Sequence, residues 1–163
     1  MDAYRAIVTK RDTREYAATP IPEDVLHRIL QAGRMAGSSK NTQPVRLVVL
    51  REPARREALA KCGDFTTPVL SCDVAVAIVL APEGRVFDAG RSGQNMMVAA
   101  WSDGVASCPV AIYRQDDARE TLGLPAGYTV EMVITMGYPA EGAVMSRGNR
   151  RVDLDEMVHR ERW

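Results

Sequence analysis

One stretch, residues 86–104, constrains the fold more than any other part of the chain. Pro82 and Gly84 interrupt the chain just before it, and Gly104 stands where a helix could end on a left-handed residue. The stretch contains no proline, and about seventeen residues of α-helix would span about 25 Å. Its apolar run, Met96–Trp101, covers every side of such a helix, which is typical of a buried helix. We therefore expect a central core helix here.

The first half of this helix is rich in small residues. Ala89, Gly90, Ser92 and Gly93 would let another backbone approach closely. Two interpretations remain open, because one small domain rarely needs a helix that is buried on all sides. The helix is either the core of one compact domain, or it is also half of a symmetric interface between two copies of the chain.

Length and charge narrow the class of protein. The chain has 163 residues, which favours a single domain spanning 1–163 with a core large enough to need neither disulfides nor metal. Its 21 basic and 21 acidic residues cancel, so no net field attracts nucleic acid or an anionic membrane.

Cysteine usage and apolar runs predict a soluble, cytoplasmic protein. Cys62, Cys72 and Cys108 are odd in number and widely spaced, a pattern that favours reduced thiols over a disulfide framework or a zinc site. The start of the chain lacks the apolar core of a signal peptide, and the longest apolar run, residues 74–81, is too short to span a bilayer.

The order of expected elements predicts an α+β fold. Apolar spacing, caps and breakers predict helices near residues 4–8, 23–35, 53–59, 86–103 and 116–122, and a last helical turn after Asp153. Strands are expected at 45–50, 73–80, 107–113 and 128–137. This order lacks regular βαβ alternation, so a doubly wound parallel sheet fits less well.

Familiar catalytic motifs are absent from the sequence. It contains no GxGxxG turn, no GxxxxGK[ST] loop, no HExxH and no GxSxG. If the chain is an enzyme, a cofactor is therefore expected to supply the hard chemistry.

Three polar clusters are candidates for holding a ligand. The amino-terminal basic cluster, Lys10, Arg11 and Arg14, could bind a phosphate and a polarised ring carbonyl, although a solvated basic turn would look the same. The polar loop, residues 37–44, could hydrogen-bond a ligand or simply connect a helix to a strand; its candidate side chains are Ser38, Ser39, Asn41 and Gln43. The carboxyl-terminal arginines, Arg160 and Arg162, belong either to a disordered tail or to one anchored by Trp163.

Taken together, these features resemble the nitroreductase family of FMN-dependent, homodimeric flavoproteins, nearly end to end. KRDTREY, residues 10–16, stands where the family carries an Arg-Arg-Ser-x-Arg flavin motif, and MAGSSKNTQP, residues 35–44, is similar to its Pro-Ser-Ser-x-Asn-x-Gln-Pro loop. Residues 88–110 resemble its central helix followed by a Gly-x-x-Ser-Cys strand. LGLPAGYTVEMVITMGYPAE, residues 122–141, and the closing HRERW also match in order.

The resemblance implies a mixed, mainly antiparallel sheet flanked by helices, a tail exchanged in a homodimer, and FMN at the seam between subunits. The amino-terminal basic cluster would contact the FMN phosphate, ribityl chain and N1–O2 edge, and the polar loop would approach from the partner subunit. The carboxyl-terminal arginines would reach the phosphate. Flavin N5 would lie near the backbone of Cys108, Pro109 and Val110.

The function implied is hydride transfer from NADH or NADPH, through flavin N5, to nitroaromatics, quinones or related small acceptors by a ping-pong mechanism. No side chain is expected to act as a nucleophile, because a nearby arginine stabilises the negative charge that develops at N1–O2.

Three departures from the family pattern affect the expected site. Gly37 replaces a proline, which removes rigidity from the polar loop. Asp12 replaces a serine, and its carboxylate would repel phosphate but could accept hydrogen bonds from ribityl hydroxyls. The connector 81–85 is short, which predicts a more open site.

Three alternatives remain open. A protein of the same fold could use its flavin for dehalogenation, dehydrogenation or flavin breakdown. It could bind FMN without turnover. A nucleic-acid-binding domain is disfavoured by the neutral net charge and the few aromatic residues.

Overall fold

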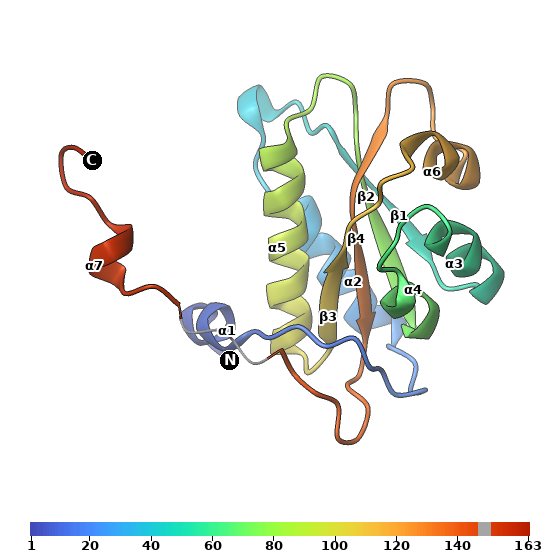
Figure 1. The fold of residues 1–163 in the computed structure, drawn as a ribbon, viewed down its shortest axis with the longest axis horizontal. Coiled ribbons are helices and arrows are strands. Elements are labelled where there is room, and N and C mark those ends of the chain that lie inside the picture. Colours follow the sequence, from blue (N-terminus) through green and yellow to red (C-terminus); the bar gives the residue numbers. More distant parts are fainter. Residues whose placement is uncertain (147–150) are drawn as a thin grey trace.

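The most apolar strand of the chain lies inside the sheet. The computed structural model describes residues 1–146 and 151–163, and its strands are hydrogen-bonded in the order β1-β2-β4-β3 (Figure 1). Their bounds are Val45–Leu50 for β1, Val74–Leu80 for β2, Ala106–Val110 for β3 and Thr129–Gly137 for β4. Every residue of β2 is buried, because β1 and β4 flank it and helices cover both faces.

Side chains of β2 alternate between two hydrophobic cores, as the period of a strand requires. Val74, Val76 and Ile78 pack with α2 and α5, whereas Ala75 and Ala77 pack with α3, α4 and α6 on the other face. Figure 1 shows the two helical layers on either side of the sheet. Their bounds are Glu23–Arg34 for α2, Pro53–Ala60 for α3, Thr67–Ser71 for α4, Val86–Ser102 for α5 and Gln115–Leu122 for α6.

The central helix α5 has the expected length and end. It spans 17 residues, and Gly104 follows it with a φ of 75°, the left-handed conformation that suits glycine. Within the single chain, however, α5 is not buried on every side. Met96 and Ala100 are buried against the sheet and α2, whereas Phe87 on the opposite face is 72% exposed and Gln94 is exposed too. The outer face is open because no other element of the described chain covers it along most of its length.

Two terminal segments lie outside the layers. Helix α1, Ala3–Thr9, is held at the end of α5 by a 3.0 Å hydrogen bond from Trp101 Nε1 to Thr9 Oγ1. Helix α7, Leu154–Met157, and the tail after it extend away from the rest of the chain (Figure 1). Apolar side chains of both segments are exposed: Tyr4, Ile7, Val8, Leu154, Met157 and Trp163.

The expected α+β class is confirmed, and each expected strand and helix is present within a few residues. All strand pairs in the described chain are antiparallel, and a parallel pairing occurs only at an isolated bridge between Asp12 and Ser107. Strand β3 ends at Val110, three residues earlier than expected, because Tyr113 turns away and its backbone N–H donates to Cys62 O. Helix α4 was not expected. No helix in the described ranges is long and apolar enough to cross a membrane.

The contact between α2 and α5 depends on Gly33. A Cβ at this position would lie 2.6 Å from Met96 Cγ and 3.2 Å from Ser92 Oγ, and Met96 is fully buried. We predict that Gly33→Ala lowers the free energy of unfolding by about 1–3 kcal/mol, because overpacking displaces α2. Urea denaturation measures the change. The exposed neighbour variant Arg34→Ala should stay within about 0.5 kcal/mol of the parent, and an equally small effect of Gly33→Ala would contradict this packing.

Candidate flavin site

The amino-terminal basic cluster lies along β3, at the carboxyl end of α5. Asp12 forms the parallel bridge with Ser107, and the Thr13 N–H donates to Ser107 O at 3.4 Å. The Asp12 backbone is also held from its other side, since Ser146 N–H donates to Asp12 O at 2.8 Å and Asp12 N–H donates to Ser146 Oγ at 3.2 Å. The segment is therefore fixed in place although it belongs to no regular element.

Tyr16 anchors the same segment to the sheet. Thr135 Oγ1 donates to Cys108 O at 3.0 Å, and the Tyr16 hydroxyl lies 2.7 Å from Thr135 Oγ1 and donates to Thr13 O at 3.0 Å. Burial raises the pKa of the Tyr16 hydroxyl above its ordinary value, which keeps this donor protonated. The chain of hydrogen bonds fixes the carbonyl of Cys108, on the strand that was expected to lie near flavin N5.

The three cations of the cluster differ in their surroundings. The Lys10 side chain is only 10% exposed and forms an ion pair with Asp12. Arg11 donates to the carbonyl oxygens of Val8 and Lys10, at 3.1 and 2.8 Å. Arg14 is exposed, and its guanidinium has no hydrogen-bonding partner within residues 1–146 and 151–163. Arg14 is thus a full positive charge with five donors directed at no other group of the described chain.

Strand β3 offers backbone but no reactive side chain. It is an edge strand, and Pro109, which has no N–H to donate, is tolerated there. The Cys108 thiol is buried, and this burial raises its pKa although nearby Arg14 partly offsets the effect. The thiol is therefore neutral near pH 7 and poorly suited to act as a nucleophile. This fits the expectation that Cys108, Pro109 and Val110 contribute backbone alone.

The polar loop lies at the opposite, amino end of α5 (Figure 1). Lys40, Asn41 and Gln43 have φ values of 51°, 55° and 50°, a left-handed conformation that non-glycine residues rarely adopt. Ser38 Oγ accepts a 2.8 Å hydrogen bond from the Gln43 backbone, which helps to hold this geometry. Strained backbone of this kind is concentrated at ligand-binding and catalytic sites.

Gly37 does not leave the loop unsupported. Arg91, on the outer face of α5, donates a 2.7 Å hydrogen bond to Gly37 O, and a Cβ on Gly37 would lie 3.1 Å from the same guanidinium. The short connector, residues 81–85, also supports the polar loop, because Ala81 N–H donates to Pro44 O at 3.0 Å. Contacts from α5 and the connector thus replace the rigidity that a proline would supply.

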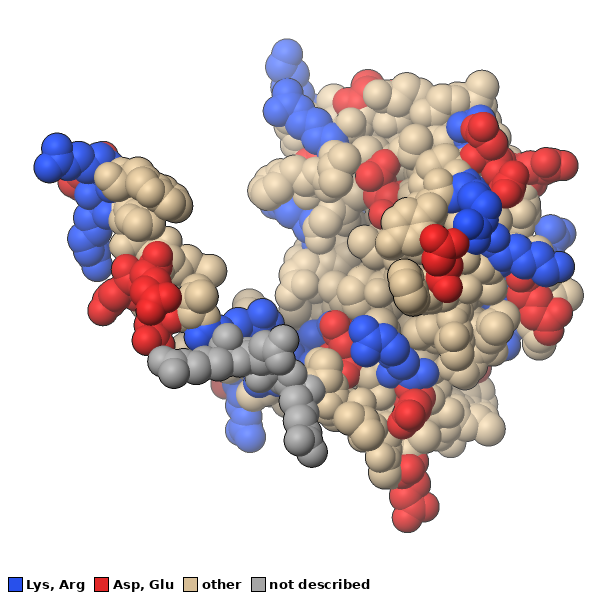
Figure 2. Space-filling view, in the orientation of Figure 1, with Lys and Arg blue, Asp and Glu red and all other residues tan. Residues whose placement is uncertain are grey.

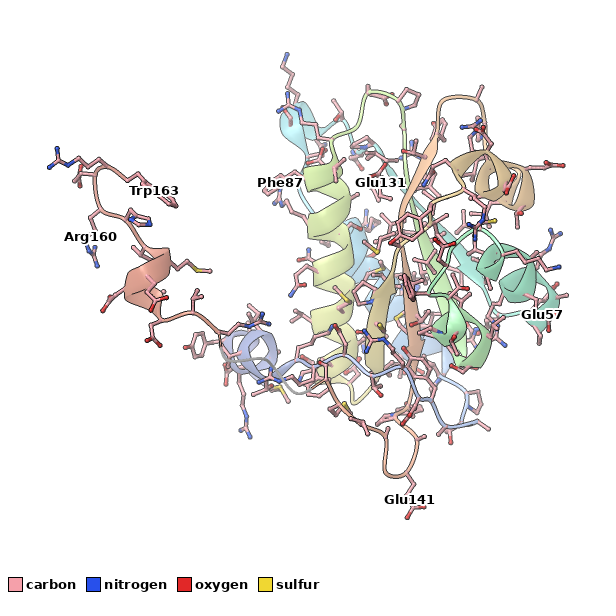
Figure 3. All side chains as sticks on the ribbon, in the orientation of Figure 1. Glu57, Phe87, Glu131, Glu141, Arg160 and Trp163 are labelled. Atoms are coloured by element: carbon pink, nitrogen blue, oxygen red, sulfur yellow. The ribbon has the colours of Figure 1, made fainter. Side chains whose placement is uncertain are left out.

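One chain does not bring the predicted site residues together. The amino-terminal basic cluster and the polar loop lie at opposite ends of a 17-residue helix, which is about 25 Å long. Arg160 and Arg162 are exposed, and the tail that carries them extends away from both groups (Figure 1). Trp163 (Figure 3) is 98% exposed and stacks on His159 of its own tail, with ring centroids 4.0 Å apart. Over α5 and β3, between the two ends, the surface is mostly uncharged (Figure 2).

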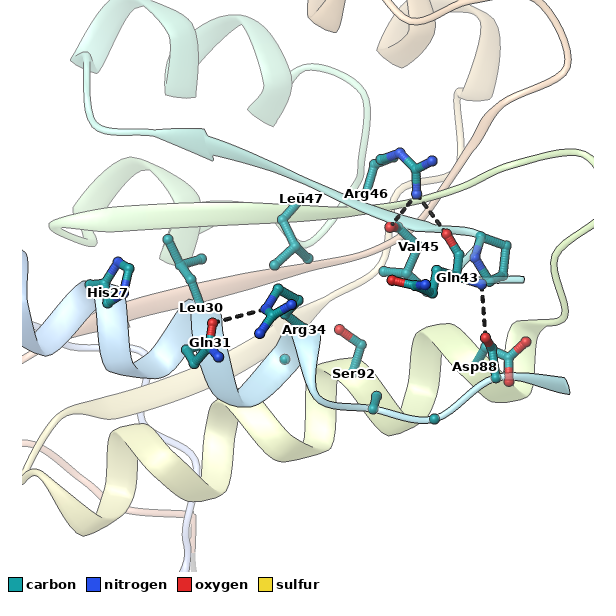
Figure 4. A pocket seen from close by; sticks show the side chains of 15 residues that line it. His27, Leu30, Gln31, Arg34, Gln43, Val45, Arg46, Leu47, Asp88 and Ser92 are labelled. Atoms are coloured by element: carbon teal, nitrogen blue, oxygen red, sulfur yellow. Dashed lines mark hydrogen bonds between the residues drawn. The ribbon is translucent and has the colours of Figure 1, made fainter. Parts of the chain in front are cut away.

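A cavity of about 420 Å³ lies between α2, the polar loop, β1 and α5 (Figure 4). Ser38 and Gln43 line it, and so does Ser92, whose 1% exposed hydroxyl has no hydrogen-bonding partner in the described chain. Sequence reasoning missed this cavity and treated Ser92 as a small packing residue. The one available signal was the pair Asp88 and Ser92, two polar residues one turn apart on a core helix.

The residues present fit a phosphorylated flavin and offer no metal centre. Permanent cations beside an edge strand suit a phosphate and an electron-rich ring edge. Among the described residues, no group of three or more histidine, cysteine, aspartate or glutamate side chains could hold a metal ion.

Comparisons with known proteins agree with this fold. A sequence model of the nitroreductase family matches residues 7–68 and 79–138, and the chain belongs to this family. It is 28% identical to an Archaeoglobus fulgidus protein provisionally named NADH dehydrogenase/NAD(P)H nitroreductase, over 99% of both chains. It is 27% identical to an NADPH-flavin oxidoreductase of Vibrio harveyi, over 82% of this chain and 64% of that protein.

Solved structures show the same fold. A Desulfovibrio desulfuricans protein, provisionally named a nitroreductase and crystallised in complex with FMN, is 26% identical over 100% of this chain and 98% of its own, with a TM-score of 0.85. A Clostridium difficile protein named an FMN-dependent nitroreductase is 22% identical over 98% and 99% of the two chains, with a TM-score of 0.87.

We expect the Tyr16 hydroxyl to contribute measurably to stability. We predict that Tyr16→Phe lowers the free energy of unfolding by about 1–2 kcal/mol, because it removes a hydroxyl that donates to Thr13 O and contacts the Thr135 hydroxyl in a buried network. Denaturant titration at pH 7 measures the change. Tyr113→Phe, at an exposed tyrosine, is the matched control and should have no measurable effect. Equal stabilities of the two variants would show that the network does not hold the segment.

Proposed function

We propose that the chain is an FMN-dependent NAD(P)H oxidoreductase that works in the cytoplasm as a homodimer, with residues 1–163 forming one flavin-binding unit. The observation that carries the proposal is the separation of the two halves of the site. The cations lie at one end of α5, and the strained polar loop lies at the other.

A two-fold axis between two copies would join these halves. If the outer faces of two α5 helices pack across an axis perpendicular to them, the helices run antiparallel, and the carboxyl end of one lies beside the amino end of the other. The amino-terminal basic cluster of each copy then meets the polar loop of its partner, which makes two equivalent sites. The exposed apolar side chains of α1 and α5, including Tyr4, Ile7 and Phe87, would be covered by the same contact.

The tail fits the same arrangement. Residues 151–163 extend from their own chain with apolar side chains and three arginines exposed. We propose that the tail wraps the partner and that Arg160 and Arg162 join the phosphate-binding cations. No membrane or nucleic acid is required, since the partners are a second copy and a small electron acceptor.

The chain's own residues would bind the flavin and stabilise charge. When bound, FMN would accept hydride and donate it. Arg14 would stabilise negative charge on the flavin ring, and it needs no proton transfer because a guanidinium stays protonated. Arg11 would hold the phosphate, and Lys10 and Asp12 would contact the ribityl chain. Ser38, Ser39, Asn41 and Gln43 of the partner would supply polar contacts from the other side.

The co-substrates follow from the relatives. Names of related proteins include NADH dehydrogenase and NADPH-flavin oxidoreductase, which supports a nicotinamide as the hydride donor. We propose nitroaromatics, quinones or related small molecules as acceptors. The donor and the acceptor would use the same space over the flavin in turn, which gives ping-pong kinetics.

Steady-state kinetics test this proposal directly. We expect the protein purified with FMN to oxidise NADH or NADPH with a quinone or nitroaromatic acceptor, and double-reciprocal lines at several acceptor concentrations should be parallel. A protein incubated with riboflavin but no FMN is the control for the phosphorylated cofactor. Lines that intersect at one point, or oxidation that needs no flavin, would contradict the mechanism.

A further inference from the structure

A carboxylate stands inside the amino-terminal basic cluster and pairs with one of its cations. The Lys10 side chain is 10% exposed and that of Asp12 is 32% exposed, and the two form an ion pair. Lys10 Nζ also lies 3.4 Å from Met97 Sδ on α5. An ammonium this deeply buried is costly unless a counter-charge accompanies it. Asp12 therefore stabilises Lys10 in its position against α5.

This pairing changes the charge that the cluster presents. Arg11 donates to neutral carbonyl oxygens, and the guanidinium of Arg14 has no partner among the described residues, so both keep their full positive charge. Asp12 lies so close to Lys10 that the two charges cancel when seen from farther away. The three cations of the cluster therefore attract an anion as two cations would.

We infer that Asp12 is a positioning residue that holds Lys10 and cancels its charge in the field at the flavin phosphate. The inference rests on the proposed function. Its consequence concerns ligand choice: the site discriminates less strongly between FMN and riboflavin than a cluster with three unpaired cations would. The two flavins differ only by the phosphate, so the ratio of their affinities isolates this effect. A purely structural defect would weaken both flavins alike.

Affinities of the flavin-free homodimer for FMN and riboflavin, measured by quenching of flavin fluorescence, test the inference. Asp12→Asn removes the charge and keeps the size of the side chain. We expect its FMN-to-riboflavin affinity ratio to rise about tenfold, which corresponds to about 1.4 kcal/mol. The matched control is Glu15→Gln. Glu15 belongs to the same segment but accepts a hydrogen bond from the Val144 backbone and pairs with no cation of the cluster, so its ratio should not change.

A double-mutant cycle keeps the test decisive if Asp12→Asn alone does not fold. Lys10→Gln alone leaves Asp12 unpaired near the phosphate, and the ratio should fall about tenfold. The double variant Lys10→Gln/Asp12→Asn removes a neutral pair, so its ratio should return to within about threefold of wild type.

Each outcome has a distinct meaning. A double variant whose ratio stays as low as that of Lys10→Gln would show that Lys10 binds the phosphate directly, and it would overturn the inference. An unchanged or lower ratio in folded Asp12→Asn would also overturn the inference. The proposed function would still stand in that case if the wild type binds FMN. A wild-type protein that binds neither flavin would overturn both.

Discussion

The packing of α5 between the sheet and the molecular surface determines the rest of the structure. Its inner face meets β2, β4 and α2 through small or flexible side chains such as Gly93 and Met96, so the helix lies close to the sheet. Its outer face is left open by the chain's own elements. Because α5 is long and straight, it also separates the amino-terminal basic cluster from the polar loop. One helix thus creates both an uncovered surface and a divided site.

Much of the fold could be predicted from local patterns. Strand β2 follows from an uninterrupted apolar run, and α5 follows from its breakers at both ends. Helix α4 was missed because Pro68 suggests a break, although proline in the first helical turn needs no N–H partner. The end of β3 was misplaced because a tertiary contact, Tyr113 N–H to Cys62 O, turns the chain. The open outer face of α5 in the single chain was not predictable, because residue type alone does not reveal which face a neighbour covers.

The candidate site could be predicted only in part. Spacing identified Lys10, Arg11 and Arg14 as a group, and the structure places them together beside β3. The pairing of Lys10 with Asp12 was not predictable, because it depends on burial against Met97 at a distance of 87 positions in the chain. The strain at Asn41 and the unpartnered hydroxyl of Ser92 likewise arise from three-dimensional packing. The amino-terminal basic cluster and the polar loop lie at opposite ends of α5, and no common motif in the sequence links them.

Mixed dimers test most directly whether two chains complete one site. Arg14→Ala removes a cation of one chain, and Asn41→Asp adds a charge to the polar loop with a residue that tolerates its left-handed conformation. Each variant alone should lose bound FMN. If the site is shared across the two-fold axis, randomly mixed chains regain one intact site in each heterodimer, and bound FMN recovers to about a quarter of the wild-type amount. No recovery above the two parent variants would contradict a site shared between subunits.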